Sequence, residues 1–339
     1  MARVNRLLTL LLTLMLLTGA QAARAGLLVL PPNTQTIEAG SHVSWIKDAP
    51  GTTPEQALQS LLNELGNSSQ SDFPSFGLSR DSYWLLLSLD NQSDQIRWML
   101  EAGRPHIGRL DVYLFDAYLQ PVGHWWSGST RPLDARPYLH GHLIFPLPLS
   151  PGRSYMLLRA ASHNMLDLPI TFSKPDAFYQ TASLRQLLNG LFFGAILVLC
   201  LYNLLLFFST RDRSYVTYVL YIGSFGLFLA SRGGLTVRWL WPDMPAWNSI
   251  SMTVIVYLTL AFSMLFLRDF LQLPRLFPRT SRAFVIGAGI MTVSALVSPF
   301  FPFEMTVWNN VPTLLWPVVA MAVSLAVLYK GYEPARYFV

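Results

Sequence analysis

The chain has 339 residues, of which 52% are hydrophobic and only 13% are charged. This composition is too apolar for a single soluble globule and indicates a protein partly embedded in a membrane. Residues 26–176 carry 14 acidic and 10 basic side chains, whereas residues 177–339 carry 5 acidic and 11 basic ones. The overall charge of +5 therefore reflects basic loops beside a membrane and does not indicate a nucleic-acid partner.

The N-terminus has the pattern of a secretory signal peptide, which we place at residues 1–25. Arg3 and Arg6 precede an apolar run from Leu7 to Leu17, and small residues with an Ala-x-Ala pattern follow. A short membrane anchor is the less favoured interpretation, because so brief a run does not comfortably span a bilayer. The sequence thus predicts an exported domain that begins near residue 26.

Residues 26–176 contain short alternating runs separated by turn residues, a pattern typical of β-strands. The runs cover residues 82–89, 96–101, 110–115, 142–145, 154–159 and 168–172. Their close spacing predicts an antiparallel β-sandwich. One helix is expected at 54–65, with Thr53 as its N-cap and an apolar stripe that ends at Leu65. The single cysteine, Cys200, lies outside this region, so we expect a domain without a disulfide.

Aromatic and polar side chains in predicted loops or strand ends are the candidate ligand-binding residues. Sugar sites stack rings on aromatic faces and surround them with hydrogen-bonding groups. The candidates are Arg104, His106, His124, Trp125, Trp126, His163 and Asn164. The alternative, which we favour for the two tryptophans, is that they cover the sandwich core. His140 and His142 could share one strand face, but no third metal ligand accompanies them, so we expect neither a metal nor a cofactor.

Five apolar segments follow, and most reach or approach the roughly 20 residues that span a bilayer. They cover residues 187–208, 215–230, 250–267, 283–297 and 311–328 in a bundle region of 177–339. With the exported domain outside, the outer connections contain only Arg232 and Arg238. The inner connections contain Arg211, Arg213, Arg268, Arg275, Arg279, Arg282, Lys330 and Arg336. The positive-inside rule therefore predicts a multi-pass protein of a bacterial inner membrane with its N-terminal domain in the periplasm.

No acidic residue lies centrally in a predicted span, which disfavours a proton or cation transporter. Asn203 could bond a neighbouring helix. The Gly190-x-x-x-Gly194 pattern permits close helix packing, either inside the bundle, which is the safer interpretation, or between protomers. The sequence contains no G-x-S-x-G, H-E-x-x-H or P-loop motif, so we do not expect an enzyme.

Several segments carry a family resemblance. In the exported region these are residues 76–91 and the turn at 150–153; in the membrane half they are 201–204, 211–215, 240–242, 268–271 and 331–338. In order and spacing they resemble the bacterial seven-transmembrane receptors with diverse intracellular signalling modules. This resemblance implies an exported jelly-roll sandwich similar to carbohydrate-binding modules, followed by a helical transmembrane bundle.

The resemblance also implies a function. The expected protein is a membrane-bound sensory receptor whose sandwich binds a small-molecule or glycan ligand in the periplasm. Its bundle, set in the lipid bilayer, would pass the signal to a cytoplasmic partner or through a homo-oligomer. Receptors of this family have seven spans and usually an output module, whereas this sequence stops at Val339. We therefore expect a truncated product or fragment; the alternative is that the rest is encoded elsewhere. The alternatives are a membrane-anchored carbohydrate-active enzyme and a transporter accessory protein.

Overall fold

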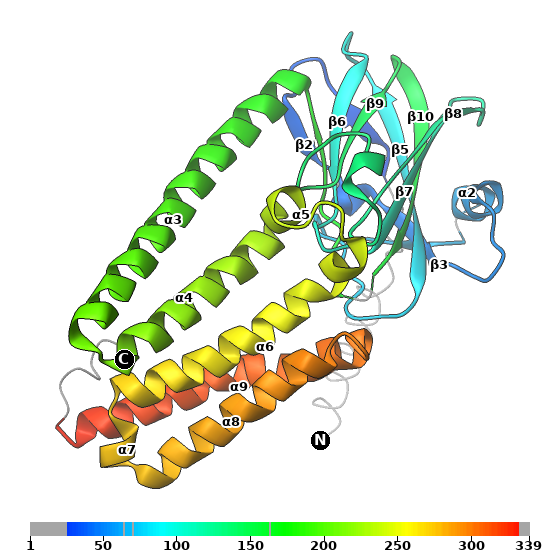
Figure 1. Ribbon diagram of the computed structural model, residues 1–339. Coiled ribbons are helices and arrows are strands. Elements are labelled where there is room, and N and C mark those ends of the chain that lie inside the picture. The colour runs from blue at the N-terminus through cyan, green and yellow to red at the C-terminus, as the bar shows by residue number, and fades with distance from the viewer. Residues whose placement is uncertain (1–25, 64, 70, 163, 332–339) are drawn as a thin grey trace, which may run out of the picture.

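The computed structural model describes residues 26–63, 65–69, 71–162 and 164–331. The signal peptide expected at residues 1–25 lies outside the described residues. A β-rich N-terminal domain is followed by a series of long helices (Figure 1). This arrangement confirms the predicted fold class, a β-domain joined to a helical bundle.

Across the described residues, the strands form a seven-stranded sheet and a four-stranded sheet that pack face to face. In the larger sheet the order is β4-β3-β5-β10-β7-β8, with β1 paired to the end of β5. Its strands are β1 (Leu28–Leu30), β3 (Ser44–Lys47), β4 (Asn67–Ser68), β5 (Ser82–Asn91), β7 (Arg109–Asp116), β8 (Pro121–Ser127) and β10 (Gly152–Ala161). The smaller sheet has the order β2-β11-β6-β9. Its strands are β2 (Thr36–Glu38), β6 (Arg97–Ala102), β9 (Ile144–Pro148) and β11 (Ile170–Ser173).

One pair departs from the antiparallel arrangement that the strand pattern predicts. Strands β1 and β5 run parallel, with Leu28 opposite Leu89 and Leu30 opposite Asn91. Tight hairpins force neighbouring strands to be antiparallel, whereas a long connection leaves the direction free. The chain between β1 and β5 is long enough to permit the parallel pairing.

The main core lies between the two sheets. Leu85, Leu87 and Leu89 of β5 face Trp98 and Leu100 of β6, and all of them are fully buried. A second cluster covers the outer face of the larger sheet, where Trp84 and Leu86 pack under helix α2. Strand β5 is therefore buried on both faces, which explains its nearly continuous apolar sequence.

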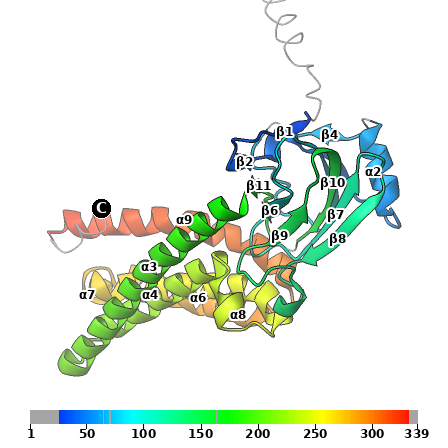
Figure 2. The ribbon, with the colours of Figure 1, turned by 90° about the horizontal axis from the view of Figure 1, so that it is seen from above.

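Helix α2 (Pro54–Leu62) begins as predicted, with a capping box between Thr53 and Gln56. Viewed from above, it lies beside the larger sheet (Figure 2). Its own residues Leu58 and Leu61 are buried against that sheet. The predicted end at Leu65 is wrong: the helix stops at Leu62, and Leu65 is 72% exposed. Short helical turns also occur at Gly40–His42 and Leu133–Ala135.

Five of the described helices are long and apolar enough to cross a membrane. They are α3 (Pro175–Thr210), α4 (Arg213–Arg232), α6 (Pro245–Phe270), α8 (Pro278–Val297) and α9 (Pro302–Tyr329). The short helices α5 (Leu235–Trp239) and α7 (Leu273–Leu276) lie between them. Each predicted apolar segment lies inside one of the five. Helix α3 starts 12 residues before the segment at 187–208, because Pro175 begins a helix that continues directly from the sandwich.

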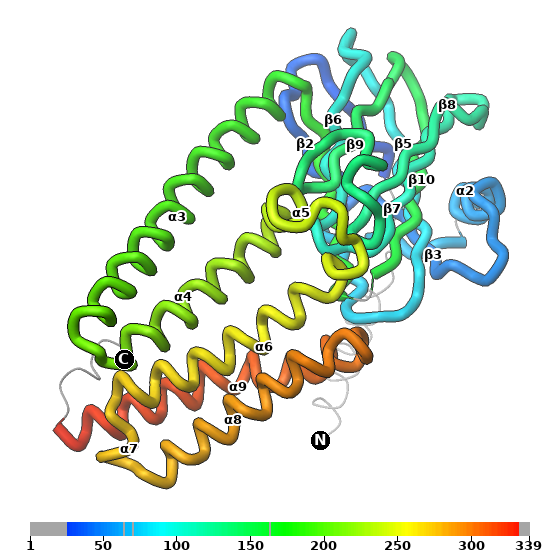
Figure 3. Tube along the Cα trace, viewed as in Figure 1, coloured from blue at the N-terminus to red at the C-terminus, as the bar shows by residue number. Residues whose placement is uncertain are grey.

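Helix α6 is the centre of the bundle, and most of its apolar window is buried in the protein. Tyr257 of α6 donates a hydrogen bond to the carbonyl of Met305 in α9 at 2.8 Å. Helix α3, by contrast, lies at the edge beside α4 (Figure 3), and none of its apolar window is buried. Such a helix leaves most of its surface open to lipid or to other membrane helices.

Two expectations about α3 are wrong. Asn203 donates to the carbonyl of Leu199 on its own helix at 2.9 Å, and it forms no hydrogen bond to another helix of the described bundle. A methyl group added to Gly190 or Gly194 would meet no described atom of another element within 4 Å, so the two glycines mediate no packing within the described bundle. Close packing between α3 and α4 occurs instead at Gly226, whose missing side chain makes room for Ile196.

The sandwich rests on one end of the bundle. Asn248 at the start of α6 donates to the carbonyl of Ser129 at 3.1 Å. Arg80 pairs with Glu304 at the start of α9, and its guanidinium lies 4.5 Å from the centre of the Phe303 ring. These contacts join the sandwich to α6 and α9. Further contacts with α3 and α5 fix its position on the membrane helices.

Candidate ligand site between the sandwich and the bundle

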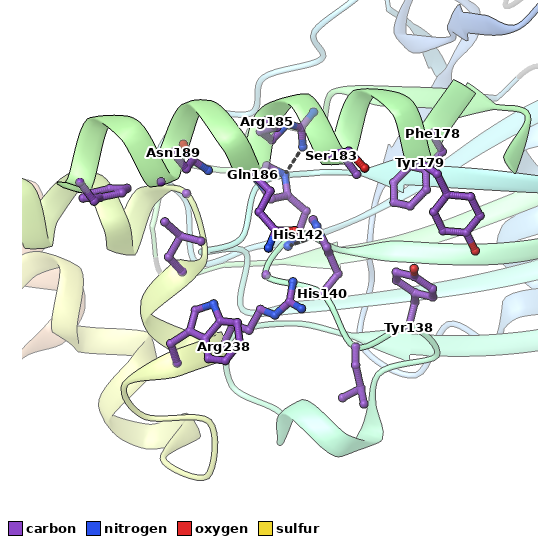
Figure 4. A pocket seen from close by; sticks show the side chains of 18 residues that line it. Tyr138, His140, His142, Phe178, Tyr179, Ser183, Arg185, Gln186, Asn189 and Arg238 are labelled. Carbon is purple, nitrogen blue, oxygen red and sulfur yellow. Dashed lines mark hydrogen bonds between the residues drawn. The ribbon is translucent and has the colours of Figure 1, made fainter. Parts of the chain in front are cut away.

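A cavity of about 400 Å³ lies where the sandwich meets the bundle. Its walls come from the loop at residues 138–142, the first half of α3 and the turn from α4 into α5 (Figure 4). The polar lining residues include Tyr138, His140, His142, Tyr179, Ser183, Arg185, Gln186, Asn189 and Arg238. Small-molecule sites have roughly this volume and this mixture of aromatic and polar walls.

A buried arginine holds the loop that supplies the two histidines. The guanidinium of Arg136 donates to the carbonyls of His140 at 2.9 Å and Gly141 at 3.2 Å, and more weakly to that of Gly128. Burial lowers the pKa of Arg136 to about 10, so the group stays charged at neutral pH. These hydrogen bonds hold the loop against the Arg136 guanidinium and orient His140 and His142 toward α3.

Glu101, His142 and Arg185 form a charged cluster on the sandwich side of the cavity. The carboxylate of Glu101 lies 2.7 Å from Nδ1 of His142 and 3.1 Å from a guanidinium nitrogen of Arg185. Burial alone would raise the pKa of Glu101, but its hydrogen bond to His142 and the charges of His142 and Arg185 outweigh this and lower the pKa to about 2. Glu101 on β6 is therefore ionised and ties α3 to the sandwich.

His140 lies at the centre of the cavity wall. Burial, followed by repulsion from His142, lowers the pKa of His140 to about 4. Its Nδ1 accepts a hydrogen bond from the backbone N–H of His142 at 3.0 Å, which requires an unprotonated nitrogen. The rings of Tyr138 and His140 both pack edge-on against Phe178 of α3. His140 is thus a neutral, aromatic part of the wall at pH 7.

Arg238 enters the cavity from α5 (Figure 4). Its guanidinium lies 5.1 Å from the centre of the Trp239 ring, and it forms no hydrogen bond or ion pair with any residue that the structure describes. Burial is the main cause of the lowered pKa of His140, and the charge of Arg238 acts in the same direction. Burial raises the pKa of Tyr138, and the charge of Arg238 opposes this increase. Arg238 is half-buried and lacks a counter-charge among the described residues.

A smaller cavity of about 180 Å³ lies on the other side of the Glu101 cluster. Arg104 lines it, together with Glu101, His142 and Arg185. Of the residues proposed from the sequence, Arg104 is thus adjacent to the junction. Within the described residues there is no group of three or more His, Cys, Asp or Glu side chains that could hold a metal ion.

The three candidates on β8 lie elsewhere. His124 stacks on Tyr113 with ring centres 4.2 Å apart, and Trp126 is 51% exposed beside the guanidinium of Arg131. Trp125 points to the opposite face and packs against the main core, in agreement with the interpretation that it is a core residue. In the described structure none of the three lines the two cavities.

His106 and Asn164 occupy loops that face the bundle. Nε2 of His106 lies 3.3 Å from the carbonyl oxygen of Met165, and burial lowers the pKa of His106. Asn164 donates to the carbonyl of Ser249 in α6 at 3.5 Å. His163 lies outside the described residues. The structure therefore does not bring the six described candidates together at one place.

The residues that gather at the junction were only partly visible in the sequence. His140 and His142 stood out as a pair, and Arg238 stood out as one of two basic residues in the outer connections. Nothing in the sequence linked them to Arg185, because the four side chains come from three separate elements. The available sequence signal for the site was Arg238, because basic residues are uncommon in the outer connections of a membrane protein.

The fold and its junction define a multi-pass membrane protein with a β-sandwich seated on its helices. Comparison with protein families identifies it further. Residues 40–174 match the family 7TMR-DISM extracellular 2, and residues 185–339 match the family 7TM diverse intracellular signalling. The chain belongs to the 7TM receptors with diverse intracellular signalling modules. A comparison with curated proteins finds no significant match.

Proposed function

We propose that the protein is a sensory receptor of a bacterial inner membrane whose periplasmic sandwich binds a small molecule and transmits the signal inward. The junction cavity carries this proposal, because its walls belong to both the sandwich and the bundle. A ligand shifts a conformational equilibrium only if it binds the two states with different affinity. A molecule enclosed by both parts meets this condition whenever the parts move relative to each other.

The distribution of charge supports the orientation. The basic side chains of the inner connections lie at the helix ends remote from the sandwich, at the α3–α4 turn and around α7. Lys330 belongs to the same end, since its ammonium lies 4.1 Å from the centre of the Phe277 ring. Arg336 lies outside the described residues. Positive charge at that end favours a cytoplasmic location for it and a periplasmic one for the sandwich.

A carbohydrate-like ligand is supported by the strand order. The chain alternates between sheets so that β2-β11-β6-β9 faces β5-β10-β7-β8, an order that supports a jelly roll. Carbohydrate-binding modules use such sandwiches. Aromatic rings from Tyr138, Phe178, Tyr179 and Trp239 in the cavity wall supply the stacking surfaces that sugar rings prefer.

The test combines binding with a measurement of movement. The full chain would be placed in lipid nanodiscs, with Cys200→Ala and spin labels at Tyr118→Cys on the sandwich and Phe300→Cys near the α8–α9 turn, both well-exposed sites. We expect a bound glycan or other small molecule to change the distance between the labels. Binding without any change of distance would contradict a receptor, and chemical conversion of the glycan would favour an enzyme.

A further inference from the structure

The charge inside the junction cavity is unbalanced. Its described lining contains two arginines, Arg185 and Arg238, and no aspartate or glutamate. Glu101, in the adjacent wall, pairs with Arg185 and His142 and supplies the counter-charge on that side. The charge of Arg238 remains uncompensated among the described residues. A half-buried cation without a counter-charge is costly, so the cavity favours a ligand that brings a negative charge.

The rest of the cavity suits the body of a small ring compound. Tyr138, Phe178 and Tyr179 form one aromatic wall, with Phe178 edge-on to Tyr138 and 6.0 Å between their ring centres. Ser183, Gln186 and Asn189 add hydrogen-bonding groups along α3 (Figure 4). An arginine fork binds carboxylate and phosphate oxygens in a planar geometry, while the aromatic faces accept a flat or sugar ring.

We propose that the junction cavity is a binding site for a small organic acid whose oxyanion pairs with Arg238 while its ring packs against Tyr138, Phe178 and Tyr179. The inference deepens the proposed function, on which it rests, by naming the class of ligand that bridges the sandwich and the bundle. A phosphate on a lipid headgroup offers Arg238 the same kind of oxyanion. A lipid could reach the cavity because α3 continues from it into an apolar segment that is not buried in the described protein.

The test measures preference for the charged form of matched ligands. The full chain in phosphatidylcholine nanodiscs would be titrated with benzoate and benzamide, and with D-glucuronate and D-glucuronamide. We expect at least one acid to bind about tenfold or more tightly than its amide, as a charge-assisted hydrogen bond predicts. Arg238→Gln should remove this preference, whereas Arg238→Lys should keep part of it.

Arg232→Gln is the matched control, because Arg232 is exposed at the end of α4 and does not belong to the described lining of the cavity. It should leave the preference unchanged. In a parallel arm, the melting temperatures of the wild type and of Arg238→Gln are compared in phosphatidylglycerol and phosphatidylcholine discs. A stabilisation by phosphatidylglycerol that Arg238→Gln abolishes would assign the anion to a lipid, whereas acid binding in phosphatidylcholine assigns it to a soluble compound.

Two outcomes would overturn the inference. The first is equal affinity for each acid and its amide, with the label distance still responsive; the anion site then fails while the receptor proposal stands. The second is the absence of both acid binding and any lipid effect that depends on Arg238. If ligands bind with charge preference but the label distance stays fixed, the anion site stands and the receptor proposal fails.

Discussion

Gly141 of the sandwich and Gly234 of the bundle touch backbone to backbone. A methyl group placed on Gly141 would lie 2.6 Å from the carbonyl oxygen of Gly234, closer than side-chain carbons normally approach. Gly234 also has φ of +73°, a left-handed conformation that favours glycine. This contact closes the junction beside the cavity and sets how near the sandwich can come to α5.

Gly141→Ala should therefore push the sandwich away from the bundle. The new methyl meets rigid backbone, so we expect a destabilisation of about 1–3 kcal/mol, typical of overpacking. Melting in nanodiscs and proteolysis at the junction would measure it. Gly190→Ala is the control, since its added methyl meets open space on a helix and should be neutral or slightly stabilising. Equal melting temperatures for Gly141→Ala and wild type would contradict this role of the contact.

Glu101→Gln should loosen α3 from the sandwich. The substitution removes the carboxylate that binds His142 and Arg185, leaving a partly buried guanidinium without its counter-charge. Because the Arg185 side chain is 38% exposed, solvent screening limits the expected loss to about 1–3 kcal/mol. Urea unfolding would measure the loss. Glu38→Gln on exposed β2 should change the free energy of unfolding by less than about 0.5 kcal/mol.

Stability should fall in two steps as the solution is acidified. The pKa of His140 is lowered from 6.5 to about 4, so between these values the unfolded chain binds a proton that the folded protein does not. The pKa of Glu101 is lowered from 4.5 to about 2, and the same reasoning gives a further loss as the pH falls through that range. Both groups therefore destabilise the fold on acidification.

Substitutions separate the two steps. His140→Gln should flatten the dependence of the unfolding free energy on pH between about 6.5 and 4, and Glu101→Gln should flatten it between about 4.5 and 2. Unfolding of the reconstituted chain at a series of pH values would measure both slopes. A slope between pH 6.5 and 4 that survives His140→Gln would assign the effect to another group.

Substitutions of aromatic residues distinguish the junction from the β8 surface. Tyr138→Ala removes a ring from the cavity wall, and we expect it to weaken binding of D-glucuronate or benzoate by about tenfold. Trp126→Ala removes an exposed ring beside Arg131 on β8 and should leave this affinity unchanged. The opposite pattern, with Trp126→Ala the damaging change, would place the site among the candidates suggested by the sequence.

Much of the architecture follows from local patterns. Thr53 and Gln56 specify the start of α2, because a capping box depends only on residues three apart. The end of that helix was misjudged at Leu65 because apolar periodicity continued past the last residue that finds a core beneath it. Likewise, the strand pattern reveals β5 and β10 but not the parallel partner β1, whose pairing depends on a distant segment.

The candidate site was predicted least well. Sequence reasoning favoured aromatic residues in loops, and His124 and Trp126 are indeed on the surface, but on a different part of the sandwich from the junction cavities. Only Arg104 among the described candidates lines one of the two junction cavities, the smaller one. The cavity with the unbalanced charge depends on Arg185 and Arg238, whose apposition to the sandwich loop is a property of how the two halves dock.

The sequence by itself determined six of the strands, the five apolar helices and the charge bias along the chain, because each of these follows from the periodicity and composition of neighbouring residues. Only the tertiary structure decided that His140, Arg185 and Arg238 share one cavity. The physical reason is that docking depends on shape and charge between elements far apart in the chain. The close backbone contact between Gly141 and Gly234 is part of the docking that brings the three side chains to one cavity.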